Sequence, residues 1–492
     1  RAAQLILSVV DANIADEDLD LWCLLADLYL DKLDEPKQGE ELLWKLFQMF
    51  PERESIFTRL NALYTTPAER KLFVANLEQS VNQSDAIRSN HALVRKYLGF
   101  CANILGQELG IWKEAQDLFT RALEVSSEPS ADLVKNRAYA RCRVPGEARC
   151  AYEEFCQLLT DDPFQVDIYR AAFDICKRNR ATDRERILKQ LAQVFIPDAG
   201  LHLDATSLRP KMMDSRPLSD EVLLKHLSPR PLQTVQIMLH EAMPILSRAL
   251  RDDVPRKTNL GGDKVKDPKI TGLFDMCAQA FGIHGIKGFL GHDTSPIPTV
   301  LDDPPAYWIY ADTWATLPQE LQRHWAGYAC GMLWTGISRL LYSGPQKIWR
   351  CLDGIYYLAT GNGIVVRDAY TKEAAERIDT IFERGTRKAV ATMIDEIGTE
   401  NIPITAAPLW LDGIWATADR AGLLFSGSLG ASLPAILLAE GWNPENTDQD
   451  YLAARYKQSK RLTPLVKFAL SDDYLALRFH AGLAMKPSII NG

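Results

Sequence analysis

The feature that most constrains the fold of this chain is a spacing of small and apolar residues that recurs along its N-terminal part. In each occurrence a small residue is followed by apolar or small residues four and then three positions further on, and then by a proline. The three stretches are Gly39, Leu43, Leu46 and Pro51; Ala115, Phe119 and Ala122, with Pro129 two residues late; and Ala151, Phe155, Leu158 and Pro163. Steps of four and three place residues on one face of a helix, and proline ends a helix. The spacing therefore predicts a series of similar helices.

The distances between these stretches indicate a repeat of constant length. Ala151 follows Ala115 by 36 residues, and Ala115 follows Gly39 by 76, about two repeats. A degenerate unit is therefore expected in between. Its predicted positions are Leu60, Leu63, Tyr64, Leu72 and Leu77. The opening unit adds Trp22, Leu25, Ala26 and Tyr29, and a last unit runs through Ile168, Tyr169, Leu188, Leu191 and Val194 to Pro197.

This region, roughly residues 1–198, resembles tetratricopeptide repeats. In such repeats small residues let paired helices approach closely, and stacking of several pairs buries a continuous core. The resemblance implies a mainly α chain that opens with an α-solenoid and binds a protein or peptide partner. An irregular helical bundle without a binding groove stays open as the alternative, because degenerate units do not show which residues line a groove.

The pattern changes after Pro197, and two further segments are expected. Residues 199–269 contain prolines and a charged, glycine-bearing stretch, which predicts a linker with one helix. Residues 270–492 then form a second, α+β domain. Its strand candidates are Ile286 to Leu290 and Ala306 to Tyr310.

The linker helix, Leu232 to Leu250, contains the beginning of a zinc motif. His240 and Glu241 match the first two positions of H-E-x-x-H, but Pro244 stands where the second histidine is needed. Two histidines four apart are required because that spacing puts both imidazoles on one helical face. We therefore interpret His240 as a histidine at the helix surface or the edge of a core, and we expect a kink at Pro244.

The second domain contains the run Ala418-Asp419-Arg420-Ala421-Gly422, which together with the order of strands and helices resembles zinc peptidases of the gluzincin class over about residues 270–440. In those peptidases a strand leads into the helix of H-E-x-x-H, and an Ala-Asp pair follows a metal-binding glutamate on a later helix. The resemblance implies a mostly helical metallopeptidase-like fold. Chains that join repeats to such a domain are similar to large cytosolic proteins of the myxobacterial type.

The positions that would bind zinc carry other residues. Aligned on the helix that starts near Glu320, both histidines become glycines, Gly327 and Gly331, and the catalytic glutamate becomes Tyr328. Trp415 replaces the ligand glutamate four residues before Asp419. A gluzincin needs two imidazoles, a carboxylate and a glutamate base. We therefore expect a pseudo-enzyme without metal or cofactor, in which Asp419 caps or pairs locally.

A second register of the same motif begins at His324. It places Trp325 at the glutamate and Tyr328 at the second histidine, so it supplies one imidazole and no base. This register also predicts no zinc site.

The alternative to a pseudo-enzyme is a cysteine peptidase that uses His284 and Cys330. His284 precedes Cys330 by 46 residues, the order found in caspase-like peptidases, where the imidazole activates the thiolate. Those enzymes place both residues at the ends of parallel strands. Residues 319–334 instead show helical periodicity, with no strand before Cys330.

Charge and cysteine content narrow the function classes. The net charge of -8 argues against a dedicated nucleic-acid binder, since phosphates require a basic face. Nine cysteines without regular spacing indicate a reducing cytoplasm rather than a secreted disulfide scaffold. The group Cys142, Cys150 and Cys156 has no nearby histidine and fits no common zinc site. The first residue is Arg1 rather than methionine, so the lack of a recognisable signal peptide does not decide the compartment.

One segment, Ala421 to Ala439, carries no charged side chain. Its glycines, serines and Pro434 favour a buried helix pair over a transmembrane span.

The expectation from the whole sequence is a cytoplasmic protein-protein interaction scaffold or adaptor, one subunit of a larger assembly, with a catalytically inactive second domain. A purely structural subunit is the further possibility.

Overall fold

The computed structural model describes residues 18–33, 35–125, 130–200, 217–229, 245–246, 248–250, 260–292, 295–302, 304–336, 338, 342, 344–360, 369–397, 407–443, 445–446, 448–484 and 490. These residues are mainly helical, with one small sheet, so the expectation of a mainly α chain is confirmed. The chain divides into two compact units. The first comprises Arg1–Leu158 and Ile490–Gly492, and the second comprises Leu159–Ile489.

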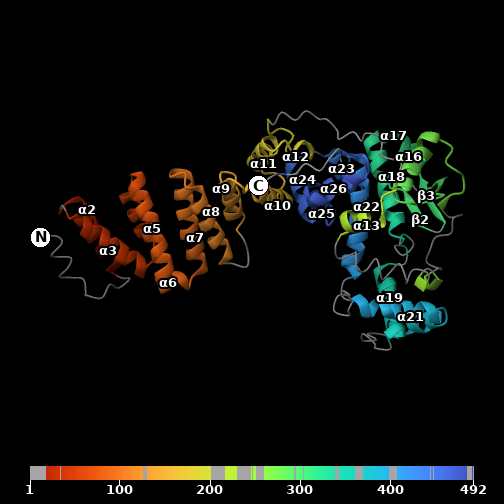
Figure 1. Cartoon of the computed structure of the whole chain (residues 1–492), viewed down its shortest axis with the longest axis horizontal. Helices are drawn as coiled ribbons and strands as arrows, with labels where there is room; N and C mark the ends of the chain where they lie inside the picture. Colours follow the sequence, from red (N-terminus) through yellow and green to blue (C-terminus); the bar gives the residue numbers. More distant parts are fainter. Residues whose placement is uncertain are drawn as a thin grey trace. The chain divides into compact units, whose positions relative to one another are not determined.

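The first unit is built from consecutive helices. They are α2 (Leu19–Asp31), α3 (Pro36–Met49), α4 (Glu54–Leu63), α5 (Pro67–Gln83), α6 (Asp85–Arg88), α7 (His91–Asn103), the π-helix η2 (Ile104–Glu108), α8 (Trp112–Glu124), α9 (Ala131–Arg141) and α10 (Ala148–Asp161), which runs past the unit boundary. Helices that are neighbours in sequence pack on one another, α2 on α3, α3 on α4, α7 on α8 and α8 on α9. Figure 1 shows them in chain order, red to orange.

The residues of the recurrent spacing lie on second helices of these pairs. Gly39 of α3 faces α2 so closely that a Cβ atom there would lie 2.7 Å from Cγ of Leu30 and 3.0 Å from the carbonyl oxygen of Ala26. Ala115 of α8 and Ala151 of α10 are fully buried. Small residues at this position therefore let each helix approach its neighbour. The degenerate unit expected around Leu60 to Leu77 corresponds to α4 and α5, while Pro129 lies outside the described residues.

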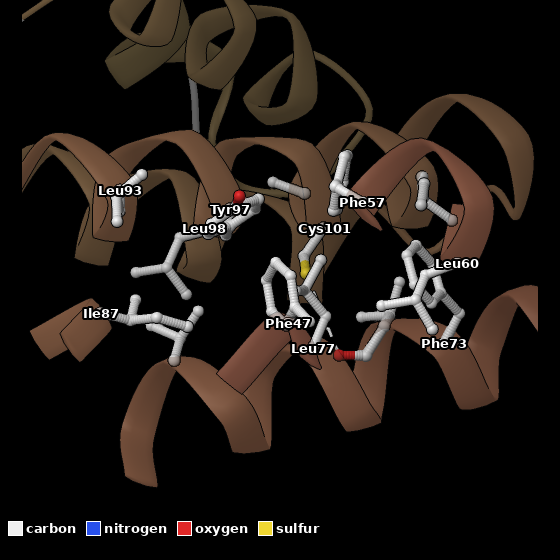
Figure 2. Packing of buried hydrophobic residues seen from close by; sticks show 14 of the residues in the cluster. Phe47, Phe57, Leu60, Phe73, Leu77, Ile87, Leu93, Tyr97, Leu98 and Cys101 are labelled. Carbon is white, nitrogen blue, oxygen red and sulfur yellow. Dashed lines mark hydrogen bonds between the residues drawn. The ribbon is translucent and has the colours of Figure 1, made fainter. Parts of the chain in front are cut away.

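Aromatic side chains from four helices fill the core of the first unit (Figure 2). The ring of Tyr97 on α7 lies 5.0 Å from that of Phe47 on α3 and 5.0 Å from that of Phe57 on α4. Phe73 of α5 lies 6.2 Å from Phe57. Such ring pairs stabilise a core by about 0.5–1.5 kcal/mol beyond the area that they bury. The core therefore joins adjacent helix pairs, as no single pair buries enough surface alone.

The second unit opens with α11 (Val166–Arg178) and α12 (Thr182–Phe195). These helices pack on each other, and α12 also packs on the later helices α23 (Leu429–Ala439) and α25 (Leu462–Leu470). The side chain of Gln190 on α12 donates to the carbonyl oxygen of Gly427 and accepts from the amide of Leu429. Helices α11 and α12 therefore belong to the second compact unit. The boundary between the two units along the sequence lies before residue 198, the expected end of the repeats. Residue 198 as the end of the repeat-like region stays a prediction.

The remaining elements of the second unit include a small sheet and a long helix pair. They are α13 (Asp220–Val222), η3 (Leu223–Leu227), α16 (Pro268–Ala280), β1 (Lys287–Leu290), β2 (Thr299–Asp302), β3 (Pro305–Ile309), α17 (Ala311–Thr316), α18 (Gln319–Trp334), α19 (Pro345–Thr360), α20 (Ala369–Asp379), α21 (Arg384–Ile397), α22 (Ala407–Ser426), α24 (Gln449–Gln458) and α26 (Asp472–His480). The expected helix Leu232 to Leu250 is described only at residues 245–246 and 248–250. His240, Glu241 and Pro244 lie outside the described residues.

The sheet has the order β1-β3-β2, with β1 parallel and β2 antiparallel to β3. The two predicted strands correspond to β1 and β3. In β3 the residues from Ala306 to Ile309 are all buried, which explains their unbroken apolar run. Helix α18 packs against β2 and α16 (Figure 1).

Candidate functional site

The most extensive helix contact in the described part of the second unit joins α18 and α22, and glycines of α18 make it close. A Cβ atom at Gly327 would lie 2.7 Å from the carbonyl oxygen of Ala421. One at Gly331 would lie 2.5 Å from Cβ of Ala421 and 3.3 Å from Cα of Ala418. Real Cβ atoms do not approach other atoms so closely in packed interiors. The two backbones therefore touch at Gly327 and Gly331.

The contact is equally close from the side of α22. A Cβ atom at Gly422 would lie 2.5 Å from Cε1 and Nδ1 of His324. His324 is fully buried on α18, so its ring packs flat against the α22 backbone. Glycines on both helices thus interlock the pair, which explains the run Ala421-Gly422 without any metal.

The residues present do not fit a zinc ion. Gly327 and Gly331 provide no ligand atom, and the space that two imidazoles would need is filled by Ala418, Ala421 and Phe425. Tyr328 replaces the base, and burial raises the pKa of its phenol above the ordinary value, with Arg461 offsetting part of this effect. Within the described ranges, no group of three His, Cys, Asp or Glu side chains is arranged to hold a metal ion.

Asp419 pairs with a residue far away in sequence. Arg461, on the turn between α24 and α25, donates from Nη2 to Oδ1 at 2.6 Å and from Nε to Oδ2 at 2.9 Å. The Asp419 side chain is 1% exposed and that of Arg461 is 15% exposed. The expectation that Asp419 caps or pairs locally is therefore wrong. No helical spacing connects these residues, because their contact depends on tertiary packing.

Two aromatic rings face the same guanidinium. The Cζ atom of Arg461 lies 5.5 Å from the ring centroid of Trp415 and 5.7 Å from that of Tyr328. The two rings stack with centroids 6.4 Å apart and planes at 19°. Tyr328 and Trp415, the positions of the base and of the ligand glutamate in the gluzincin pattern, thus meet around an organic cation. We call Asp419, Tyr328 and Trp415 the Arg461 site.

The charges in this site support one another. Burial disfavours the guanidinium, but the carboxylates of Asp419 and, to a smaller extent, Glu440 outweigh burial and raise the pKa of Arg461 above its ordinary value. Asp419 accepts two charge-assisted hydrogen bonds in a fork geometry, the strongest kind of pairing available to a carboxylate. The pair is therefore ionic inside the protein, with each charge dependent on the other.

A second buried polar contact lies on the same helix pair. Nδ1 of His324 lies 3.0 Å from Oγ of Ser432, which in turn lies 3.0 Å from Oγ of Ser426. Burial, followed by the nearby positive charge of Arg461, lowers the pKa of His324 to about 3. The imidazole is therefore neutral at physiological pH and holds α18 to α23 through Ser432. Its Nε2 atom is buried and has no hydrogen-bond partner among the residues that the structure describes.

The alternative pair His284 and Cys330 lies in two different environments. Cys330 is fully buried on α18, and its thiol donates to the carbonyl oxygen of Phe274 at 3.8 Å. Its thiol neighbour is Cys277, whose pKa is raised well above the ordinary value, first by burial and then by Cys330. His284 is exposed after α16, and no hydrogen bond among the described residues connects it to Cys330.

Sequence reasoning missed the residue that completes the Arg461 site. Arg461 follows Asp419 by 42 residues and belongs to no motif, so only the fold brings them together. The contact of His324 with Ser432 was missed for the same reason, since the two lie 108 residues apart.

The first unit contains a separate cavity of about 590 Å³ between the ends of α5, α7 and α8 and the short helix α6. Its lining combines buried apolar side chains with polar ones at the rim. The residues are Val81, Asn82, Arg88, His91, Val94, Leu98, Arg121, Glu124 and Val125. The volume lies within the range of ordinary ligand sites. No sequence pattern indicated this cavity.

The chain matches no protein-family model, no curated protein and no solved structure in comparisons with each.

Among the helices in the described part of the chain, none combines the length and the apolar character that a membrane crossing needs. The nine cysteines, with Cys142, Cys150 and Cys156 among them, are thiols rather than disulfides in this structure.

Proposed function

We propose that this chain is a non-catalytic scaffold or adaptor in the cytoplasm, one subunit of a larger protein assembly. The helix pairs of residues 1–198 form a tetratricopeptide-like solenoid that binds a protein or peptide partner. Residues 270–492 form a gluzincin-like domain that has lost its chemistry and supplies a second interaction surface. No nucleic acid, metal or cofactor takes part.

The observation that carries this proposal is the closed contact between α18 and α22. A working gluzincin needs an open metal position between its motif helix and the helix of the Ala-Asp pair. Here glycine contacts bring the backbones together at Gly327 and Gly331, and Arg461 lies where positive charge is needed beside Asp419. Side chains for catalysis and the room for them are lost together.

Partner binding is supported by the first unit. Its helices recur in pairs with small residues at equivalent positions, the arrangement that leaves extended surfaces in repeat proteins. The cavity beside α7 offers an apolar floor, Val94 and Leu98, and a rim that includes Arg88 and His91. Apolar pockets with a few polar groups are the usual anchor points for a bound segment. Nine cysteines that are thiols rather than disulfides agree with a reducing compartment.

Affinity capture from native extract tests the proposal with the full chain as bait. The double variant Arg88→Glu/His91→Trp reverses one rim charge and fills the cavity without touching the core, since both residues are exposed. Lys113→Glu, an equally exposed charge reversal on α8, is the matched control. We expect a stoichiometric partner with the wild type and the control, and its loss with the double variant.

Two outcomes count against the proposal. If the wild type captures no protein above background, the proposed adaptor function is contradicted. If the purified chain shows peptidase activity, the proposal that the second domain is inactive is contradicted. Size-exclusion chromatography of native extract separates a permanent subunit, found only at high mass, from an adaptor that also occurs alone.

A further inference from the structure

The Arg461 site has the composition of a receptor for a planar cation. Asp419 presents both carboxylate oxygens to one guanidinium, at 2.6 Å and 2.9 Å. Tyr328 and Trp415 present ring faces, which carry negative quadrupole density, within 6 Å of the same group. Two elements, α18 and α22, thus converge on the one cation that the turn before α25 supplies.

Hydrogen bonds of Ser459 hold the turn that carries Arg461 in place, independently of the contacts of the Arg461 side chain. Oγ of Ser459 accepts from the amides of Arg461 at 3.1 Å and Leu462 at 2.9 Å, which caps the start of α25. The same hydroxyl donates to Glu440 at the end of α23 at 3.0 Å. The guanidinium is therefore delivered with little loss of conformational freedom, as in a preorganised ligand.

The burial of the site distinguishes it from an ordinary ion pair. In the first unit Arg59 also donates from Nε to a carboxylate, that of Asp27 at 3.1 Å, but both side chains are about one third exposed. Water screens such a surface pair, and its contribution to stability is small. Asp419 is shielded from water, so its charge requires a partner at all times.

We propose that Asp419, Tyr328 and Trp415 form a guanidinium-binding site that the chain occupies with its own Arg461. The internal cation fastens the α24–α25 turn to the α18–α22 pair and so helps to hold this domain together. The ligand class is a planar, bidentate cation, and a compact ammonium ion does not replace it, because it lacks the fork and the flat face. The inference is independent of partner binding by the first unit.

Chemical rescue of the full-length Arg461→Ala variant tests this inference. The truncation leaves Asp419 and the two rings around a vacated space, and methylguanidinium supplies the missing group from solution. We expect Arg461→Ala to lower the Tm of the second unit, and methylguanidinium to restore several degrees with a saturable dose response, as ligand binding to the folded state requires. Methylammonium, with the same charge and no planar fork, is expected to restore little. Wild-type protein, whose site is filled, is expected to show no gain with either cation.

The inference is overturned if Arg461→Ala unfolds at the wild-type Tm, if both cations act alike, or if methylguanidinium stabilises the wild type equally. Arg461→Lys keeps the test decisive in case the alanine variant does not fold. It retains the charge, and we expect a lower Tm than that of the wild type and no rescue. A wild-type Tm for Arg461→Lys would show that charge alone is sufficient and would reject a guanidinium site.

Discussion

At the scale of single residues, the second unit depends on charges that are buried in pairs. Asp419 and Arg461 lie in an interior where neither is stable alone, and removal of one partner leaves the other uncompensated. His324 shows the opposite solution, since the same interior keeps its imidazole neutral. The Asp419–Arg461 pair and His324 are therefore sensitive to substitution and to pH in ways that exposed residues are not.

The substitution Asp419→Asn tests the buried pair. It preserves shape but leaves the Arg461 guanidinium without a counter-ion, and we expect a loss of about 3–5 kcal/mol in unfolding free energy of the second unit. The matched control is Asp27→Asn, which breaks the partly exposed pair with Arg59 and is expected to change stability by less than about 1 kcal/mol. Urea titration of both variants gives the comparison. Equal effects would contradict a buried role for Asp419.

The pH dependence of stability tests His324. Its pKa is about 3 in the folded chain and 6.5 when unperturbed, so between these values only the unfolded state binds the proton. Stability of the second unit is therefore expected to fall as pH falls from 6.5 towards 3, at up to about 1.4 kcal/mol per pH unit from this residue. In His324→Gln this contribution disappears and the pH profile flattens. A steep profile in His324→Gln would assign the effect to other groups.

Single-residue roles were the least predictable from the sequence. The sequence identified Gly327, Gly331 and Asp419 as special positions because a motif spacing pointed to them. It did not reveal that the glycines serve close helix contact or that Arg461 pairs with Asp419, since both facts depend on which elements meet in space.

At the scale of elements, the α18–α22 pair depends on the absence of side chains. Gly331→Ala adds a Cβ atom that would lie 2.5 Å from Cβ of Ala421, and such overpacking costs about 1–3 kcal/mol. Gly385→Ala is the matched control in α21, where nothing lies within 4 Å of the added atom, and there alanine is expected to stabilise the helix by about 0.5–1 kcal/mol. Opposite signs in thermal unfolding are the expected result. A neutral Gly331→Ala would mean that the helices can separate at no cost.

Elements were largely predictable where a local pattern decides them. The spacing around Gly39 and Ala115 falls on α3 and α8, and the apolar runs near Leu290 and Ile309 form β1 and β3. The strand β2, Thr299–Asp302, was missed, and its place in the sheet comes from its antiparallel pairing with β3. The π-helix η2 was also missed, and no local pattern of residues indicated it.

At the scale of the whole molecule, the chain consists of two compact units, each with its own core. Phe47→Ala removes a fully buried ring from the first unit and is expected to cost about 3–5 kcal/mol there. Hydrogen exchange followed by mass spectrometry separates the two units. We expect faster exchange in peptides from α3 to α7 and unchanged exchange in α18 and α22. Equal acceleration in both units would show that they unfold as one.

The central claim is that a closed helix pair with an internal cation replaces a metal centre. The most direct measurement is the zinc content of the purified full-length chain after dialysis against zinc, together with that of Asp419→Asn. The account predicts far less than one zinc per chain in both proteins, because Gly327, Tyr328, Gly331 and Trp415 provide neither ligands nor space. One zinc per wild-type chain, lost in Asp419→Asn, would contradict it.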